Sequence, residues 1–351
     1  MTLNAFQNHF DRALVKFFKQ KSGKMSLLGD AFLQEILTYP QQLLLGGKRV
    51  RPYVASLMFR ASGGKSGPEL YNTLVALELF HLFGLIHDDI IDHGKTRHGI
   101  PTLHLHVADR LKRAHRLGDS AHIGSGQALL VGDLLFSWSM ELFSKSTSFS
   151  VSAQQAARES FFHMAEEVVM GQMLDVDLTT RPAATNALVM KKMELKTASY
   201  TFVRPLEIGA ALADHSVEYK SFCRKIGIAL GLAFQIQDDL FDLTTPPKDS
   251  KKTIFSDLAE RQHTLFTQYI FDQGTKKQKT ELMSLMGRAL SEKERPQITR
   301  LFTETGAIEY GKQEIEKQFH IATKVLHSAK FSQEIQAEFE DLISLMRHRH
   351  A

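Results

Sequence analysis

LFHLFGLIHDDIIDHGKTRHG (79–99) joins an apolar run to three closely spaced aspartates, and a second segment of similar form, QIQDDLFDL (235–243), follows much later in the chain. Residues three and four positions apart share one face of an α-helix. Each segment therefore brings three carboxylates to one side of a predicted helix: Asp88, Asp89 and Asp92 in the first patch, and Asp238, Asp239 and Asp242 in the second. The sequence predicts two helices that each carry a dense negative patch.

Both acidic patches lie where their helices are expected to end. His93 and Gly94 follow the first patch, and TTPP (244–247) follows the second. Carboxylates are unfavourable at a helix C-terminus because the macrodipole already places partial negative charge there. A hard divalent cation would compensate, and Mg²⁺ is the natural candidate if phosphates supply its remaining ligands. The alternative is that both patches simply cap solvated helix ends.

Composition is that of a globular protein with a large core. The 351 residues are 43% hydrophobic and 23% charged, with only nine prolines, and helical periods dominate. We therefore expect a single all-α domain over residues 1–351. The net charge of +4 is spread along the chain, which gives no indication of a nucleic-acid partner.

Three sequence features favour a cytoplasmic protein. No apolar run reaches the roughly eighteen residues that a transmembrane segment requires. The first residues contain acidic and polar side chains where a secretory signal would need an apolar region. The single cysteine, Cys223, excludes an intramolecular disulfide framework and fits a reducing compartment.

Positive charge is concentrated in GGKRVRP (46–52), where Lys48, Arg49 and Arg51 lie beside glycines and a helix start. Such a turn suits a phosphate or diphosphate, although a solvated basic loop is the alternative. His81 lies two turns before Asp88 on about the same side of its helix. A buried core histidine and a ligand are both open interpretations.

Seven motifs in this order resemble the trans-isoprenyl diphosphate synthase (polyprenyl synthetase) family: GGKRVRP (46–52), HDDIID (87–92), TRHGIPTLH (96–104), VGDLLF (131–136), GQMLDVD (171–177), KTASYTF (196–202) and FQIQDDLFDL (234–243). The match runs from about Gly46 to Leu258 and is closest to short-chain members such as geranylgeranyl or farnesyl diphosphate synthase. It implies an all-α helical bundle around a deep central cavity, usually in a homodimer.

The resemblance also implies an activity and its site residues. Isopentenyl diphosphate would be condensed with an allylic diphosphate that three Mg²⁺ ions bridge to the two patches. Asp88, Asp92 and Asp238 match direct metal ligands, while Asp89, Asp239 and Asp242 match supporting residues. The pocket for isopentenyl diphosphate would contain Lys48, Arg51 and His81. Residues that bind the allylic diphosphate would be Arg97, Lys196 and Lys252, and those facing the developing carbocation would be Thr197 and Gln235.

The chain departs from the family pattern in three places. His98 stands where a second arginine usually helps to hold isopentenyl diphosphate. The segment FSDLAERQHTLF (255–266) lacks the usual glycine, lysine and proline, and it has Phe255, Gln262 and Phe266 instead. The link that precedes it leaves the alignment open between Lys251 and Lys252. Any loss of function is therefore expected on this side of the site.

Product length is expected to depend on Phe83 and Gly84, five and four positions before Asp88, with Phe80 another turn below. In the family that this chain resembles, a single aromatic side chain at this depth implies short products of fifteen to twenty carbons, and we expect twenty. The mechanism requires a closed apolar pocket, because the carbocation must meet an alkene before water does.

Two other readings of the motifs exist. A non-catalytic partner subunit would keep the fold but lose metal ligands, and a terpene cyclase or head-to-head coupling enzyme would not need the pocket around Lys48.

The segment 103–126 is expected to form a mobile lid or a surface loop, because the spacing of His106, His115 and His122 fits no common metal site.

Overall fold

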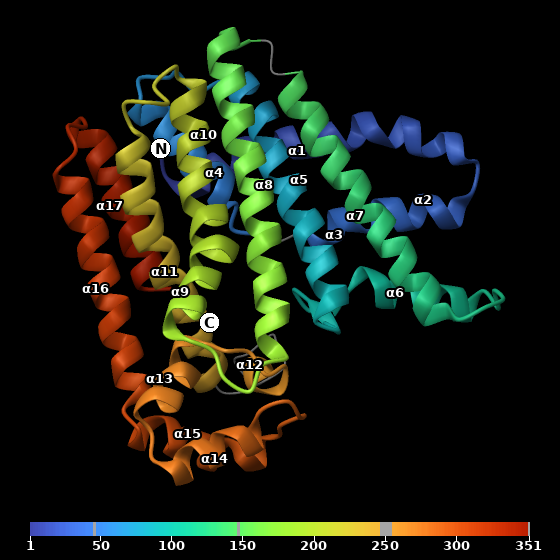
Figure 1. Ribbon diagram of the computed structural model, residues 1–351. Helices are drawn as coiled ribbons and strands as arrows, with labels where there is room; N and C mark the ends of the chain where they lie inside the picture. The colour runs from blue at the N-terminus through green and yellow to red at the C-terminus, as the bar shows by residue number, and fades with distance from the viewer. Residues whose placement is uncertain (45–46, 146–147, 246–254, 350–351) are drawn as a thin grey trace. The chain divides into compact units, whose positions relative to one another are not determined.

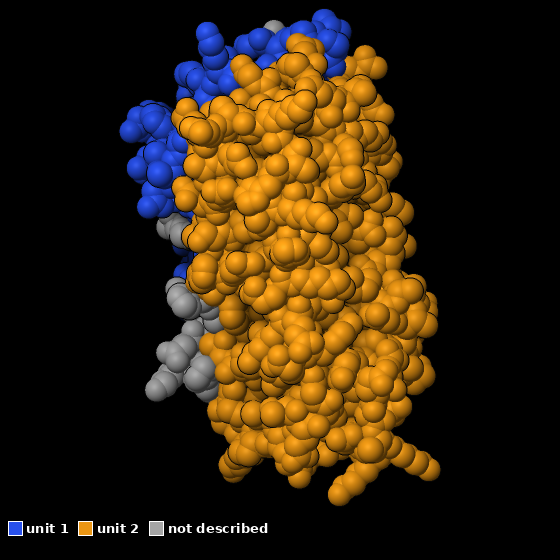
Figure 2. All heavy atoms as spheres, turned by 90° about the vertical axis from the view of Figure 1, so that its left-hand side faces the viewer, with its two compact units in different colours: residues 1–56, 64–154 blue, residues 57–63, 155–351 orange. Residues whose placement is uncertain are grey.

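The computed structural model describes residues 1–44, 47–145, 148–245 and 255–349, and these are almost entirely helical (Figure 1). The only strands in these ranges are the two-residue pair β1 (Thr96–Arg97) and β2 (Ile100–Pro101), which is antiparallel. The predicted all-α class is confirmed. The chain divides into two compact units, unit 1 with residues 1–56 and 64–154 and unit 2 with residues 57–63 and 155–351 (Figure 2). The single domain and its deep cavity remain predictions.

In unit 1, the long helix α5 (Pro68–Ile91) packs against α7 (Ser120–Ser144) and α1 (Leu3–Met25). Leu74, Leu77 and Phe80 are fully or almost fully buried along it. The remaining helices of this unit are η1 (Ser26–Leu28), α2 (Ala31–Thr38), α3 (Pro40–Leu43), the start of α4 (Val50–Ala61), and α6 (Leu103–Arg113).

In unit 2, the helix α11 (Lys220–Thr244) packs against the π-helix η2 (Glu194–Val203) and against α16 (Ala307–His327). The other helices that lie wholly or mainly in this unit are α8 (Val151–Thr179), α9 (Asn186–Met193), α10 (Arg204–Leu212), α12 (Ser256–Ala259), α13 (Leu265–Gln273), α14 (Lys276–Leu285), η3 (Glu292–Glu294), α15 (Arg295–Glu304) and α17 (Gln333–Arg347).

The two predicted acidic helix ends are confirmed. Helix α5 ends at Ile91 with Asp92 as its C-cap residue, and the Asp92 N–H donates to the Asp88 carbonyl at 2.8 Å. Helix α11 continues two residues beyond Asp242 and ends at Thr244. Each patch therefore lies at the C-terminal end of a long helix that is largely buried within its own unit.

Three sequence predictions are wrong: that the first helix ends near SGK (22–24), that a second helix runs over residues 27–45, and that residues 103–126 form a lid or surface loop. Helix α1 continues through Ser22 to Met25, because the exposed segment SGK contains no proline and the buried side chain of Met25 continues the stripe that includes Lys21. The helix expected over 27–45 is broken at Gly29, in the left-handed conformation, and again before Pro40. Residues 103–126 form α6 and the start of α7, because the side chains at 103, 107 and 111 are buried on one face of α6.

The backbone of η2 lies directly against its two neighbours. A Cβ added at Gly231 of α11 would lie 2.2 Å from Ala198 Cα, and one added at Gly171 of α8 would lie 2.5 Å from the Lys196 nitrogen. Such distances leave no room for a side chain. The glycines therefore let α8 and α11 hold the segment that carries Lys196 and Thr197, and π-helical turns of this kind are frequent at functional sites.

Candidate active site

In the first acidic patch, Asp89 is bound on both oxygens by Arg97. The Arg97 Nε lies 3.0 and 3.1 Å from the two oxygens, and Nη2 lies 2.6 Å from Oδ1. Asp89 is 4% exposed, and Arg97 reaches it from strand β1, which follows the end of α5. The structure thus gives Arg97, predicted as an allylic diphosphate ligand, a bidentate ion pair with a supporting aspartate.

The other two carboxylates of this patch, Asp88 and Asp92, are half-buried at the end of α5. Burial would lower the pKa of the Arg97 guanidinium, but its bonds to Asp89 and the charges of Asp88 and Asp92 raise it. The charges of all three carboxylates therefore act on Arg97, which bonds the most buried of them, Asp89.

The three cations of the basic turn differ in exposure: Arg49 is buried, Arg51 is half-buried and Lys48 is exposed. Arg49 is 6% exposed, and its guanidinium donates to Asp11 Oδ1 and Glu78 Oε1 at 2.8 Å and to the Leu44 carbonyl at 2.9 Å. Lys48 is exposed, and its carbonyl accepts a 3.0 Å hydrogen bond from the Gln7 side chain. The sequence had counted Arg49 only as part of the positive charge, whereas the structure shows that it anchors the turn.

His81 lies on α5 one turn beyond Glu78. Burial is the main reason that its pKa falls well below 6.5, and the surrounding positive charges of Arg51, Arg97, Arg49 and His98 lower it further. His81 is therefore neutral at neutral pH and can exchange hydrogen bonds without adding charge. His98 lies in the same surroundings, and its Nδ1 is 3.1 Å from the Leu43 carbonyl.

We expect His81→Gln to make the protein less sensitive to acid. Because the folded-state pKa of His81 is depressed, its contribution to stability is present above pH 6.5 and is lost as the pH falls through the folded-state value. Between about pH 7.5 and about pH 5, the wild type should lose about 1–2 kcal/mol more unfolding free energy than the variant. Urea unfolding at both pH values measures this difference. The exposed His122→Gln is the matched control, and equal losses in all three proteins would contradict the prediction.

Three phenylalanine rings form a cluster below the first patch. The Phe83 centroid lies 5.2 Å from Phe80 and 5.3 Å from Phe136, and Phe80 and Phe136 are 5.7 Å apart. Phe80 is 1% exposed, whereas Phe83 and Gly84 are half-buried. Phe136, from α7, was missed as a candidate for chain length although it ends the motif VGDLLF.

Phe83→Ala is expected to lengthen the main product, because it removes the half-buried ring of the cluster nearest Asp88. Mass spectrometry of the products after dephosphorylation measures the shift, which should be one or more five-carbon additions. Phe32→Ala is the control, since this half-buried ring lies on α2 against Arg116, outside the cluster, and its loss should leave the product unchanged. An unchanged product distribution in Phe83→Ala would reject Phe83 as the floor of the cavity.

In the second patch, Asp238 forms an ion pair with Arg349, a residue that follows α17. The guanidinium of Arg349 also donates to the Phe234 carbonyl at 3.1 Å and lies 3.9 Å from the centroid of the Phe234 ring. Asp238 keeps a 39% exposed side chain, so this carboxylate lies partly at the surface. Sequence spacing gave no signal for Arg349, which is 111 positions away.

The other two aspartates of this patch are fixed by neighbouring elements. Burial raises the pKa of Asp239 to about 7, and Asp239 Oδ1 accepts a 2.7 Å hydrogen bond from the Gln235 amide. The Gln235 Oε1 in turn accepts from the Thr197 hydroxyl at 2.5 Å. Asp242 accepts from the Ser256 N–H and hydroxyl at 3.0 and 2.8 Å and from the Asp257 N–H at 3.2 Å. Asp242 therefore caps the start of α12.

Unit 2 also brings Lys196 to a buried carboxylate. Its Nζ donates to Asp175 Oδ2 at 2.6 Å, and the other oxygen of Asp175 lies 2.9 Å from Lys192 Nζ. Lys252, the remaining predicted allylic diphosphate ligand, lies outside the described residues. Asp175 belongs to the motif GQMLDVD (171–177), but the sequence gave no sign of its contact with Lys192.

Within 255–266, the positions where the chain departs from the family pattern are buried. Phe255 and Phe266 are both fully buried, and Phe266 lies so close to Gly311 that a Cβ there would be 2.1 Å from its ring. Gln262 and His263 are 8% and 1% exposed. These substitutions therefore affect how the loop after the second patch packs, which is a structural role.

The carboxylates of the two patches suit an Mg²⁺ ion whose remaining ligands are water and substrate phosphates. The described ranges contain no preassembled group of three or more His, Cys, Asp or Glu side chains that could hold a metal. Mg²⁺ is usually bound by one or two carboxylates and completes its shell with waters and substrate phosphates. Asp88, Asp92 and Asp238 can supply such carboxylates, and Asp238 is ion-paired with Arg349 in this structure. Asp89 bonds Arg97, Asp239 bonds Gln235, and Asp242 bonds the start of α12.

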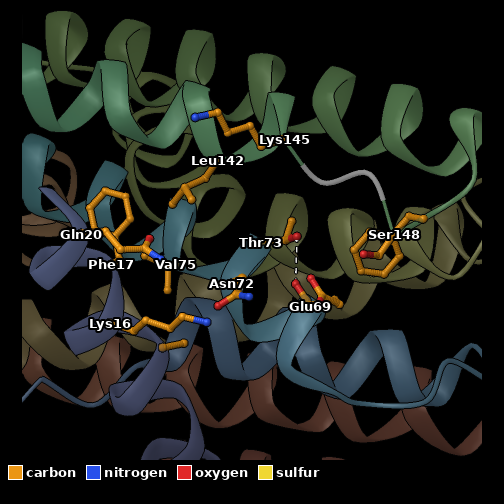
Figure 3. Close-up of a pocket in the computed structure, with 12 residues that line it drawn as sticks. Lys16, Phe17, Gln20, Glu69, Asn72, Thr73, Val75, Leu142, Lys145 and Ser148 are labelled. Carbon is orange, nitrogen blue, oxygen red and sulfur yellow. Dashed lines mark hydrogen bonds between the residues drawn. The ribbon is translucent and has the colours of Figure 1, made fainter.

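A cavity of about 180 Å³ in unit 1 lies away from these residues (Figure 3). It is lined by Lys16 and Phe17 of α1, by Asn72 and Thr73 near the start of α5, and by Lys145 just after α7. Asn72 precedes Asp88 by sixteen residues, which is about 24 Å along a helix. This cavity is therefore not part of the acidic site.

Comparison with known proteins gives consistent matches. The model of the polyprenyl synthetase family matches residues 31–303. The geranylgeranyl diphosphate synthase of Methanosarcina mazei is 31% identical over 294 residues, which cover 81% of this chain and 83% of that protein. The geranylfarnesyl diphosphate synthase of Aeropyrum pernix is 27% identical over 304 residues, which cover 86% and 88% of the two chains.

Solved structures are also similar over the whole chain. The geranylgeranyl pyrophosphate synthase of Corynebacterium glutamicum, complexed with isoprenyl diphosphate and magnesium, matches with a TM-score of 0.93 and 26% identity, and the match covers 100% of both chains. The sequence match to the family model includes both acidic patches.

Proposed function

The chain belongs to the polyprenyl synthetase family and is a trans-prenyltransferase of the isoprenyl diphosphate synthase class; on that premise we propose that it condenses isopentenyl diphosphate with an allylic diphosphate, releasing diphosphate. We further propose a product of fifteen to twenty carbons, with twenty favoured. The observation that carries the proposal is the pair of acidic helix ends in which Asp89, Asp239 and Asp242 are each fixed by a hydrogen-bonded partner.

The proposed metal ligands are Asp88, Asp92 and Asp238, for three Mg²⁺ ions. When bound, Mg²⁺ supplies positive charge that neutralises the departing diphosphate. The fixed aspartates have a different task, because each holds a neighbouring part of the site: Asp89 holds Arg97, Asp239 holds Gln235, and Asp242 holds the start of α12.

Residues of unit 2 are proposed to bind the allylic diphosphate and face its carbocation. Lys196 and Lys252, with Arg97 of unit 1, are the proposed diphosphate ligands. The hydrogen bond from Gln235 to Asp239 fixes the amide so that its oxygen accepts from Thr197. Because the Thr197 hydroxyl proton is used in this bond, its oxygen lone pairs can be presented to developing positive charge.

Isopentenyl diphosphate is proposed to bind the basic turn of unit 1. Lys48 and Arg51 supply charge, and His81 and His98 supply hydrogen bonds. Arg49 keeps the turn in place through Glu78 and Asp11. No protein side chain is assigned as the general base, since the diphosphate released in the reaction can take the final proton.

We also propose a cytoplasmic homodimer. None of the helices in the described part of the chain is both long and apolar enough to cross a membrane. Exposed apolar side chains on α8 repeat at helical spacing, at positions Phe162, Val169, Met173 and Val176. A stripe of this kind suits burial against a second copy.

Elongation assays test the function. The purified protein is incubated with Mg²⁺, isopentenyl diphosphate and, in separate reactions, allylic diphosphates of increasing length, and the products are identified by mass spectrometry. We expect elongation that a chelator abolishes and added Mg²⁺ restores. Failure to elongate any primer, in a protein that is folded by circular dichroism, would reject the synthase and favour a non-catalytic partner subunit.

A further inference from the structure

A buried ion cluster in unit 2 contains one carboxylate and two lysines. Asp175 of α8 is 3% exposed, and its two oxygens lie 2.9 Å from Lys192 Nζ and 2.6 Å from Lys196 Nζ. Burial opposes ionisation of this carboxyl, but the two ammonium groups lower its pKa below the ordinary value. Asp175 is therefore ionised, and two cations share its charge.

The two lysines are not equivalent. The Lys192 side chain is 11% exposed, and besides Asp175 its Nζ bonds the His263 carbonyl at 2.9 Å and the Gln262 side-chain oxygen at 3.5 Å. Two of these contacts are hydrogen bonds, and the third, to Asp175, is an ion pair. The Lys196 side chain is 28% exposed, and it lies in the π-helix beside Thr197. Lys192 is thus held on several sides, and Lys196 is the more accessible cation.

We propose that Lys192 is a positioning residue that keeps Asp175 neutralised, so that Lys196 can turn from this carboxylate to the diphosphate of the allylic substrate. The inference rests on the proposed function, because it takes Lys196 as a diphosphate ligand. Without Lys192, moving Lys196 to the substrate would leave a buried carboxylate with neither of these cations, which is strongly unfavourable. Lys196 would then remain on Asp175, and the substrate would bind weakly.

Lys192 also supplies a positive charge beside Gln262, which stands where the family pattern has a lysine. The Lys192 ammonium lies against Gln262 and the His263 carbonyl, so a cation is still present beside this loop. It is supplied by α9 instead of by the loop. Its charge also reaches Asp239, where it lowers the pKa of that carboxyl against the larger effect of burial.

Calorimetric titration with farnesyl diphosphate, in Mg²⁺ and without isopentenyl diphosphate, tests the proposal separately from turnover. We expect Lys192→Met to raise the dissociation constant by about tenfold or more. Lys192→Arg, which keeps the charge, should remain within about threefold of the wild type. The control is Lys191→Met. Lys191 is adjacent to Lys192, but its side chain is 51% exposed and its ion pair with Glu194 is long, at 3.4 Å. This variant should bind farnesyl diphosphate like the wild type.

The double variant Lys192→Met/Asp175→Asn separates neutralisation from packing. If Lys192 acts by neutralising Asp175, removing the carboxylate charge should restore the affinity to within about threefold of the wild type. Steady-state assays should show the same pattern in KM for farnesyl diphosphate, while KM for isopentenyl diphosphate stays unchanged. A role that is only structural would leave the double variant as weak as the single one, and would affect both substrates.

The outcomes distinguish this inference from the proposed function. Suppose that the wild type elongates farnesyl diphosphate. If Lys192→Met then binds this substrate as tightly as the wild type, or if the double variant does not regain the wild-type affinity, the proposed role of Lys192 is overturned and the proposed synthase function stands. If the wild type neither binds nor elongates any allylic diphosphate, the proposed function is overturned and the role of Lys192 with it. Tm values of all variants show which of them are folded. If Lys192→Met unfolds, the affinities of Lys192→Arg and of the double variant for farnesyl diphosphate still test the role of Lys192.

Discussion

Replacing Asp88 with asparagine should lower kcat/KM by about three orders of magnitude and leave Tm almost unchanged. The change removes one negative charge from a proposed direct Mg²⁺ ligand while keeping the size and polarity of the side chain. Asp88 is half-buried at the end of α5, so the substitution requires no repacking. Steady-state kinetics over a range of Mg²⁺ concentrations, together with thermal unfolding, measures both effects.

Asp89→Asn is the matched control, one position further along the same helix. Asp89 is 4% exposed and bonds Arg97 with both oxygens, so this variant should lose about 2 kcal/mol or more of unfolding free energy. The two variants should therefore differ in stability, with Tm almost unchanged for Asp88→Asn and clearly lowered for Asp89→Asn. A fully active Asp88→Asn enzyme would reject Asp88 as a direct metal ligand.

Arg49→Met should destabilise the protein by about 3–5 kcal/mol, the range seen when one partner of a buried ion pair is removed. Burial already raises the pKa of Glu78, and Arg49 is the largest of the effects that oppose this rise. Its loss also removes the donor to the Leu44 carbonyl and the bond to Asp11. Urea unfolding monitored by circular dichroism measures the change.

Lys48→Met is the control for this prediction, because Lys48 is adjacent to Arg49 but exposed. It should change the unfolding free energy by less than about 0.5 kcal/mol and raise KM for isopentenyl diphosphate. A double variant, Arg49→Met/Glu78→Gln, should be less destabilised than the sum of the single variants. Additive effects would show that Arg49 and Glu78 do not stabilise each other.

The helices that carry the acidic patches could be predicted because their signals are local. Apolar spacing, the glycine after Asp92 and the prolines after Thr244 all lie within a few residues of the helix ends. The segment 103–126 shows the limit of such reasoning. Its many histidines and arginines suggested an exposed loop, although Leu103, Val107 and Leu111 already had the spacing of a buried helix face.

Partners that are distant in sequence could not be predicted. Arg49 bonds residues 38 and 29 positions away, and charge composition alone cannot show that one of three clustered cations turns inward. Lys192 looked like the exposed Lys191 next to it, and only the fold shows that it is buried against Asp175 and the loop at 262–263. In each case a long-range contact changes the role of a residue whose local sequence is ordinary.

The division into two units has a consequence for laboratory evolution. The candidate chain-length residues, Phe80, Phe83, Gly84 and Phe136, all belong to unit 1, whereas Lys196, Thr197 and Gln235 belong to unit 2. Random libraries aimed at longer or shorter prenyl chains can therefore be confined to the four codons 80, 83, 84 and 136 of the first unit. The residues proposed to bind the allylic diphosphate from unit 2 and to face the carbocation would then stay constant, so product length could be selected without a simultaneous search for activity.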